Sequence, residues 1–388
     1  MHRHVCFSMK ALFLGGAGFI GTQAVEDLVG SSDFSEITLG DNDPAKAQQL
    51  VARLNDRRLS VRALDVLQEN ELVEAMKGFD VVISALPFSY DVVVTRACIR
   101  AHVNGIDVAS AREQMEMSEE ARKAGITYVM GCGATPGITN ILARRGADLL
   151  DRTDEVQISW AAFRCMAPAP GLVHTTFWEF DPTIDDRVCY ENGKYRKVPP
   201  FSGERTVEFA KPIGVQKVYY VPHPEPQTIP KAISLKRMSI RGTWPAETMR
   251  LLRFMNSFGL YRRETMEIKG QRIVPLEWLS EYLLKVPEAK ETAIWAYGLI
   301  VEVSGRSKKK RVKHVFRTSH PPMKRWGGRD AYARNVGYPL SIGAQMLAKG
   351  KVKSQGIIAP ETAFDPRSFI RELAKREIKV SHRIERLK

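Results

Sequence analysis

A glycine-rich turn near the start of the chain constrains the fold more than any other feature of the sequence. The run GGAGFIG continues directly from the apolar run ALFL and leads into a helical pattern over Phe19–Val29. In this setting, G-x-G-x-x-G spacing joins the first strand of a parallel sheet to the helix that follows it. The pattern predicts a doubly wound α/β domain that binds a dinucleotide.

Each glycine of the motif has a steric reason to be there. Gly16 allows the tight turn, Gly18 lets the backbone approach the pyrophosphate, and Gly21 lets the helix pack closely on the strand. The N-terminus of the helix then offers backbone N–H groups to the phosphates. We therefore expect the dinucleotide to contact the whole run, which comprises Gly16, Ala17, Gly18, Phe19, Ile20 and Gly21.

Further candidate cofactor residues follow the later strands. Asp41 ends the second strand, where a carboxylate accepts hydrogen bonds from the ribose hydroxyls and repels the extra phosphate of NADP. This favours NAD over NADP, although Lys46 and Arg53 on the next helix weaken the preference. Along the same edge we expect the cofactor to meet Asn42, Asp65, Val66, Ala85, Leu86 and Pro87.

The first third of the sequence alternates strand and helix patterns, which predicts a parallel sheet. The strand-like runs are Ala11–Gly15, Glu36–Gly40, Ser60–Ala63, Val81–Leu86, Ile106–Ala109 and Ile126–Gly131. Three helical patterns are each followed by a glycine that we expect to end the helix in a left-handed conformation. These glycines are Gly78, Gly105 and Gly125.

Beyond the turn at 131–137, longer alternating runs predict a mixed α+β domain. The clearest runs are Glu155–Arg164, Val173–Phe180, Gly214–Val221 and Ala293–Ser304. We therefore expect a Rossmann domain over 1–134, a second domain over 135–355 and a C-terminal segment over 356–388. That last segment is expected to contain a helix at Asp365–Arg376 and then a short strand.

The formal net charge of +14 raises the question of nucleic-acid binding. The densest basic run, 306–313, lies between two strand patterns, with Gly305 expected at the turn. A solvated hairpin tip explains it without a nucleic-acid partner. No apolar run approaches the roughly 20 residues that a bilayer requires, and we expect no membrane association.

The cysteines show no paired spacing. Cys6, Cys98, Cys132, Cys165 and Cys189 form no CxxC motif and no metal-ligand spacing with histidine. This pattern is typical of a reduced, cytoplasmic protein without a zinc site, whose cysteines are small buried side chains. Residues 1–8 read as an extension ahead of the first strand, and either Met1 or Met9 fits as the start.

The sequence resembles a known family over nearly its whole length. The segments that carry the resemblance are GGAGFIG, DVVISALPFSYDVVVTRACIRAHVNGIDVA, GCGATPGITNILARRGADLL, KVYYVPHPEPQTIPK and the C-terminal PETAFDPRSFIREL. Together they are similar to the saccharopine dehydrogenase-like family, which includes saccharopine reductases, lysine 6-dehydrogenases and carboxynorspermidine dehydrogenases. The C-terminal segment is the most particular to this family.

The resemblance implies an NAD(P)-linked oxidoreductase, forming a homodimer, that acts on the C–N bond of an amino acid or amine. It also implies that the domain over 135–355 binds the substrate and builds the dimer, and that the segment over 356–388 packs back on the Rossmann domain. Saccharopine reductases carry an Asp-Pro-Gly-Ile-Asp-His run where this chain reads ATPGITN over residues 134–140. The difference favours a smaller substrate, as in oxidative deamination of the lysine 6-dehydrogenase type. A reductase that forms a secondary amine, and a non-catalytic NAD(P)-binding regulator on the same fold, stay open as alternatives.

The sequence also offers candidates for the catalytic and substrate-binding residues. Asp107 ends the fifth strand at the edge where ligands bind in open α/β sheets, and His174 and His223 have the side chain best suited to proton transfer near neutral pH. If Val173–Phe180 is a strand, His174 and Trp178 share a face. The candidate catalytic residues are Asp107, His174 and His223, and the candidate substrate contacts are Thr135, Gly137, Thr139 and Trp178.

Overall fold

The computed structural model describes residues 8–291 and 294–387 and divides into two compact units. The first contains Met1–Ile141 and Ala333–Arg376, and the second contains Leu142–Tyr332 and Glu377–Lys388. The expected boundary at 355 is wrong. Residues after 332 already belong to the first unit, because Gly337 lies against the backbone of Ile20 and Ala24 so closely that a Cβ would sit 2.9 Å from both.

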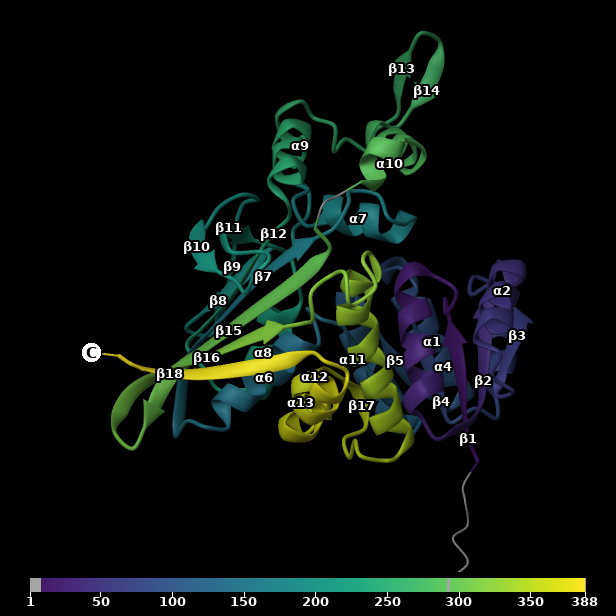
Figure 1. Cartoon of the computed structure of the whole chain (residues 1–388), viewed down its shortest axis with the longest axis horizontal. Coiled ribbons are helices and arrows are strands. Elements are labelled where there is room, and N and C mark those ends of the chain that lie inside the picture. Colours follow the sequence, from purple (N-terminus) through teal and green to yellow (C-terminus); the bar gives the residue numbers. More distant parts are fainter. Residues whose placement is uncertain (1–7, 292–293, 388) are drawn as a thin grey trace, which may run out of the picture. The chain divides into compact units, whose positions relative to one another are not determined.

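The first unit contains a parallel, doubly wound sheet, which confirms the predicted α/β class (Figure 1). Its strand order, β17-β6-β5-β4-β1-β2-β3, places β1 at the point where the winding reverses. The C-terminal part of the chain adds β17 beside β6. Its strands are β1 Met9–Leu14, β2 Phe34–Asp41, β3 Leu59–Ala63, β4 Val81–Ser84, β5 Asn104–Asp107, β6 Thr127–Val129 and β17 Gly356–Ile358.

The helices of this unit follow the local signals in the sequence. Asp43 caps α2 by accepting a hydrogen bond from the Lys46 N–H, with Pro44 in the first turn. The helix that was expected to end at Gly105 ends earlier, at His102 with φ of 55°. The helices are α1 Phe19–Ser31, α2 Pro44–Leu54, α3 Glu69–Met76, α4 Asp91–Ala101, α5 Ser118–Lys123, α12 Pro360–Ala363 and α13 Pro366–Lys375, with 3-10 turns at Phe88–Tyr90 and Arg112–Met117.

The second unit contains a mixed sheet, as predicted. Its main path is β10-β11-β12-β7-β15-β16-β18, in which β12 and β7 are parallel and the other neighbours are antiparallel. The strands are β7 Arg152–Phe163, β8 Val188–Glu191, β9 Lys194–Lys197, β10 Arg205–Glu208, β11 Val215–Tyr220, β12 Arg237–Thr243, β15 Ala296–Ser307, β16 Lys310–Ser319 and β18 Lys379–Arg386, with a separate hairpin of β13 Met266–Ile268 and β14 Gln271–Ile273.

The predicted strand Val173–Phe180 is wrong, because Pro170–Trp178 forms helix α7. Pro170 suits the first turn of a helix, and the buried residues Val173, Thr176 and Phe177 recur at helical spacing. The other helices of the unit are α8 Glu225–Ala232, α9 Ala246–Ser257 and α10 Pro275–Lys285, with a 3-10 turn at Pro287–Lys290. Helices α6 Ile138–Ala147 and α11 Asp330–Ala348 run from one unit into the other.

The basic run forms the predicted hairpin tip, although its turn is not at Gly305. Lys308 and Lys309 make the turn, with φ of 47° and 67°. Gly305 is instead buried within β15, where a Cβ would overlap the carbonyl oxygen of Arg152. The basic charges therefore lie on an exposed turn, as expected.

The described residues also bear on the predictions about the cysteines and about membrane spans. Cys98, Cys132, Cys165 and Cys189 are free and buried, whereas Cys6 lies outside the described residues. Across the described chain, no helix combines the length and apolar character needed to cross a membrane.

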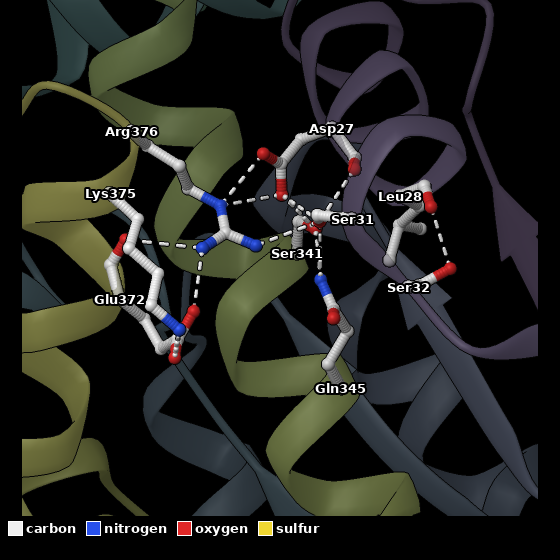
Figure 2. Close-up of polar contacts among 9 residues, drawn as sticks. All are labelled: Asp27, Leu28, Ser31, Ser32, Ser341, Gln345, Glu372, Lys375 and Arg376. Atoms are coloured by element: carbon white, nitrogen blue, oxygen red, sulfur yellow. Dashed lines mark hydrogen bonds and ion pairs between the residues drawn. The ribbon is translucent and has the colours of Figure 1, made fainter.

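A buried ion pair fastens the C-terminal segment to the first helix of the sheet domain. Arg376, which follows α13, donates to both carboxylate oxygens of Asp27 on α1 at 2.7 and 2.8 Å. Figure 2 shows its guanidinium between Asp27 and Glu372, with Ser31 also in reach. Both side chains of the Arg376–Asp27 pair are only 8% exposed.

We expect Arg376→Met to lower the free energy of unfolding by about 3 kcal/mol, because it leaves the Asp27 carboxylate buried without its partner. Urea unfolding followed by circular dichroism measures the change. The adjacent Lys375→Met is the matched control, since the Lys375–Glu372 pair has its lysine 69% exposed and its loss should change stability by less than about 1 kcal/mol. Equal effects from the two substitutions would contradict the prediction.

Candidate functional site

The turn between β1 and α1 has the geometry of a phosphate-binding turn. Gly15 adopts φ of 71°, a left-handed conformation that glycine accepts without strain. The Gly18 N–H donates to the Gly15 carbonyl at 3.1 Å, and a Cβ on Gly21 would overlap that same oxygen. The positive φ therefore falls at Gly15, one residue before the Gly16 to which the tight turn was assigned.

The N-terminus of α1 is suited to an anion. Gly18 is the N-cap residue and provides no side-chain cap, and no acidic residue occurs in the first turn. A helix start of this kind attracts phosphate through its N–H groups and its dipole. The residues present therefore fit a dinucleotide pyrophosphate.

The predicted cofactor residues after β2 and β4 lie at the same sheet edge. The strand register pairs Leu14 with Gly40 on one side and with Ser84 on the other. The positions that follow, Asp41 and Ala85, are therefore neighbours of the glycine turn. Leu86 is close enough that a Cβ on Gly15 would sit 2.9 Å from its side chain, and Pro87 follows as the exposed residue before a 3-10 turn.

Asp41 lies half-buried, and its carboxylate accepts the Asp43 N–H at 3.0 Å. Asn42 is exposed beside it. Of the two basic residues that weakened the NAD preference, Arg53 donates to Glu26 at 2.7 Å, whereas Lys46 is exposed. The ion pair with Glu26 offsets the Arg53 charge near the ribose position.

The adenine-side candidates follow β3. Asp65 is exposed and accepts the Leu67 N–H at 3.0 Å, and Val66 is half-buried. This Asx turn holds the loop after β3 in place. Contact of these two residues with a nucleotide stays a prediction.

Asp107 is fully buried, and its contacts indicate a positioning role. One carboxylate oxygen accepts the Gly131 N–H and the other accepts the Gln114 side chain, both at 2.6 Å. Burial raises the pKa of Asp107, and burial together with the Asp107 charge raises the pKa of Asp91 nearby. Asp107 thus fixes the start of the turn that leads out of β6.

That turn contains the first three substrate candidates. Gly137 has φ of 128°, and a Cβ there would overlap Gly133, so only glycine fits. The Asn140 side chain accepts the Gly137 N–H at 2.9 Å and donates to Glu361 at 2.8 Å. Thr135 is half-buried and Thr139 fully buried. Their contact with substrate stays a prediction.

His223 lies in a buried cluster of carboxylates in the second unit. Its Nε2 is 3.2 Å from Glu179 Oε1 and its Nδ1 is 3.9 Å from Glu225 Oε2. The second Glu179 oxygen accepts the indole N–H of Trp244 at 2.5 Å. All three charged side chains are at most 6% exposed, so the His223 charge state depends strongly on its neighbours.

The pKa values of this cluster follow from competing causes. Burial lowers the pKa of His223, but the hydrogen bond to Glu179 and the charges of Glu225 and Glu179 together outweigh burial and raise it. Burial raises the pKa of Glu179 more than His223, Trp244 and Arg164 lower it. The cluster therefore holds a proton more tightly than free imidazole and carboxylate groups do.

Aromatic rings enclose this histidine. Trp160 and Trp178 stack on the imidazole with centroids at 5.5 and 6.0 Å. Trp178 is half-buried, whereas Trp160 is fully buried. Indole faces beside paired carboxylates favour an organic cation.

Arg164, whose side chain is only 1% exposed, contacts several groups in the same region. Its guanidinium lies 4.4 Å from the Trp244 ring centroid and donates to Thr176 on α7 at 2.7 Å. It also donates to the carbonyl groups of Cys165 and Leu172 at 2.8 Å. Arg164 thereby orients α7, which ends at Trp178, directly before Glu179.

His174 does not join this cluster. Its side chain is exposed on helix α7, so the predicted strand alternation with Trp178 is wrong. Trp178 instead stacks on His223. The sequence reasoning missed Glu179, which stands next to Trp178 in the run HTTFWEF, because no local pattern reports a partner 44 residues away.

A cavity of about 540 Å³ lies in the second unit, next to Arg164 in the chain. Among the described residues that line it, two side chains are basic and none is acidic. The Arg329 guanidinium lies 6.0 Å from the Trp295 ring centroid. The lining residues are Cys165, Pro168, Lys290, Trp295, Met323, Gly328 and Arg329.

Comparison with known families accounts for both units. Residues 11–129 match the saccharopine dehydrogenase NADP binding domain, and residues 133–378 match the saccharopine dehydrogenase C-terminal domain. This chain belongs to the saccharopine dehydrogenase family. It is therefore a member of an oxidoreductase family, with a pyridine nucleotide as its cofactor.

Two curated relatives span nearly the whole chain. Carboxyaminopropylagmatine dehydrogenase of Synechocystis sp. is 25% identical over 389 residues, covering 95% of this chain and 96% of that protein. Carboxynorspermidine synthase of Vibrio alginolyticus is 23% identical and covers 92% of each chain.

A solved structure supports the fold. Saccharopine dehydrogenase (L-Glu forming) from Saccharomyces cerevisiae has a TM-score of 0.72 at 16% identity, covering 97% of this chain and all of that one. This similarity confirms the saccharopine dehydrogenase fold.

The raised pKa of His223 predicts a pH-dependent stability for this family member. The folded state binds the proton more tightly, so the contribution is fully present below about pH 6.5 and is lost as the pH rises through the folded pKa. The difference in free energy of unfolding between the unmodified protein and His223→Gln should therefore fall as the pH rises above about 6.5. Urea titrations at several pH values measure it, with exposed His174→Gln as control. A pH-independent difference would contradict the assignment.

Proposed function

We propose that this protein is an NAD-dependent dehydrogenase that acts on the C–N bond of an amine carrying a carboxylate. The observation that supports this most is the buried His223, which contacts Glu179 and Glu225 and stacks with two indole rings. Carboxylates and indole faces attract an ammonium group, and an imidazole transfers its proton. This set of groups has no evident purpose in binding a neutral or anionic reacting centre.

The chain's own residues have separate tasks in this proposal. Glu179 and Glu225 stabilise the positive charge of the substrate nitrogen, while His223 accepts the ammonium proton in oxidation and returns it in reduction. A bound nicotinamide supplies the hydride chemistry. Water then opens the resulting imine to a carbonyl compound and a free amine or ammonia.

The cavity lined by Lys290 and Arg329 is the proposed place for the substrate carboxylate. Lys290 and Arg329 provide two positive charges, the described lining residues include no acid, and Trp295 with Met323 offers an apolar wall. Arginine binds carboxylates through paired hydrogen bonds.

Oxidative deamination of a small amino acid is the direction we propose. The second candidate is reductive formation of a secondary amine, and the two relatives that span the whole chain favour it, since their names denote a dehydrogenase and a synthase of carboxylated amines. The co-substrate distinguishes the two, because deamination in reverse consumes ammonia, whereas the second reaction consumes a primary amine.

For the cofactor we propose NAD, since Asp41 ends β2 and Arg53 is paired with Glu26. Asp41→Ala should weaken NAD binding by about 1.5–3 kcal/mol per lost charge-assisted hydrogen bond and narrow the gap to NADP. Isothermal titration with each cofactor measures both values. Equal affinity of the unmodified protein for NAD and NADP would show that Lys46 outweighs the carboxylate.

The activity test is a screen at 340 nm with lysine, saccharopine, diamines and carboxyalkyl amines, using NAD and NADP in both directions. We expect turnover of a carboxylated amine. His223→Gln should lower kcat by a factor of about 100–10,000 while NAD affinity stays unchanged, and Arg329→Gln should mainly raise KM.

His174→Gln serves as the matched histidine control, because that side chain is exposed. A loss from His174→Gln as large as that from His223→Gln would place the base on α7 instead. Dinucleotide binding without turnover of any amine would favour the regulator.

A further inference from the structure

The C-terminal run PETAFDPRSFIREL carries two acidic side chains near its start, and their surroundings differ. Asp365 is exposed and caps α13 by accepting the Ser368 N–H at 2.8 Å, which is a local task. Glu361 lies on α12 and is only 2% exposed. Burying a carboxylate is costly unless hydrogen bonds replace its contacts with water. The position of Glu361 therefore calls for a specific partner.

That partner is Asn140, which lies 221 positions earlier in the chain. Glu361 Oε2 accepts a hydrogen bond from Asn140 Nδ2 at 2.8 Å, and Asn140 Oδ1 accepts the Gly137 N–H at 2.9 Å. An ionised carboxylate only accepts hydrogen bonds and a backbone N–H only donates them, so the two contacts together orient the Asn140 amide. Glu361 thus holds the backbone at Gly137 through one intervening side chain.

The turn over residues 131–137 is therefore held at both ends by buried carboxyl groups. At its start, Asp107 accepts the Gly131 N–H at 2.6 Å. Glu361 holds the other end indirectly. Within the turn every residue is buried except Thr135, which is half-buried. The two carboxyl groups thus fix the ends of a turn whose middle reaches the surface at Thr135.

This turn leaves β6 at the same sheet edge as the glycine turn. The strand register aligns Leu14 with Ser84 and Ser84 with Asp107, and β6 lies beside β5. Strands β4, β5 and β6 lie on one side of β1, and β2 lies on the other. A dinucleotide lies across the point where the winding reverses. With its adenosine half expected at Asp41 after β2, its nicotinamide half extends toward the turn after β6.

We propose that Glu361 is a positioning residue for the nicotinamide half of the bound dinucleotide. Through Asn140 it keeps the turn over 131–137 in the shape that receives the nicotinamide. The C-terminal segment then has two tasks in the first unit, since Arg376 also pairs with Asp27 on α1. The inference rests on the pyridine nucleotide cofactor of the family and not on the proposed amine chemistry.

Binding of NADH and of ADP-ribose, which lacks the nicotinamide, separates the two halves of the site. Glu361→Ala removes this acceptor from the Asn140 amide. It should raise the Kd for NADH about tenfold, as loss of one hydrogen bond to a charged group does, and leave the Kd for ADP-ribose unchanged. Isothermal titration measures both constants. Glu361→Gln keeps an acceptor oxygen at the same place and should retain most of the NADH affinity.

An exchange of donor and acceptor tests the contact itself. Asn140→Asp alone removes the donor and places a second carboxylate beside Glu361, so it should weaken NADH binding at least as much as Glu361→Ala does. Combined with Glu361→Gln, it should restore NADH affinity. The new amide at position 361 can donate to the carboxylate at position 140, whose other oxygen still accepts the Gly137 N–H.

Asp365→Ala is the matched control in the same segment. It removes the cap of α13, so it should lower the thermal unfolding midpoint and leave the ratio of the two Kd values unchanged. A merely structural role for Glu361 would give that same pattern. If Glu361→Ala does not fold, the exchanged pair decides.

Three results would each overturn the proposal. The first is an equal change, or no change, in both Kd values on Glu361→Ala. The second is an exchanged pair that recovers no NADH affinity. The third is an unmodified protein that binds NADH no more tightly than ADP-ribose, because the nicotinamide would then gain nothing from the turn.

Discussion

The first unit depends on the close approach of helix α1 to the turn before it. Gly21 lies against the Gly15 carbonyl so tightly that no side chain fits, and Gly15 itself adopts a left-handed conformation. The approach directs the start of α1 to the edge where β1, β2 and β4 end. The burial of Arg376 with Asp27 then fixes the far side of the same helix to the C-terminal segment. Backbone geometry at one end and one ion pair at the other thus orient the phosphate-binding helix.

The second unit depends on a different constraint, the burial of charge. Glu179, His223 and Glu225 are withdrawn from water, and each loses solvation that only its neighbours can replace. His223 and Trp244 share the two oxygens of Glu179, and Arg164 holds the helix that delivers this glutamate. Buried charge of this kind is costly to fold, so its presence points to a chemical role.

The sequence predicted the first unit well because its signals are local. The glycine turn, the Asp43 cap and the alternation of strands and helices each operate within a few residues. The errors occurred where distant contacts decide the outcome. Helix α7 looked like a strand because its residues are apolar and β-branched, yet Pro170 and packing of its buried face made it helical. The Glu179–His223 contact joins residues 44 positions apart, and the assignment of 333–355 depended on packing against α1.

The glycine turn of the first unit and the His223 cluster of the second differ in the groups they offer to a ligand. The first offers backbone N–H groups, and the second offers side chains. A phosphate group is bound by N–H groups and a helix dipole, which any sequence supplies once the glycines are in place. Such a site carries little information about the reaction that follows. An ammonium group beside a carbon to be oxidised requires a proton acceptor with a shifted pKa and fixed carboxylates, which only particular side chains in a buried position provide. Under the proposed function, the specificity of this chain therefore depends on the residues around His223, whereas the glycine turn serves cofactor binding.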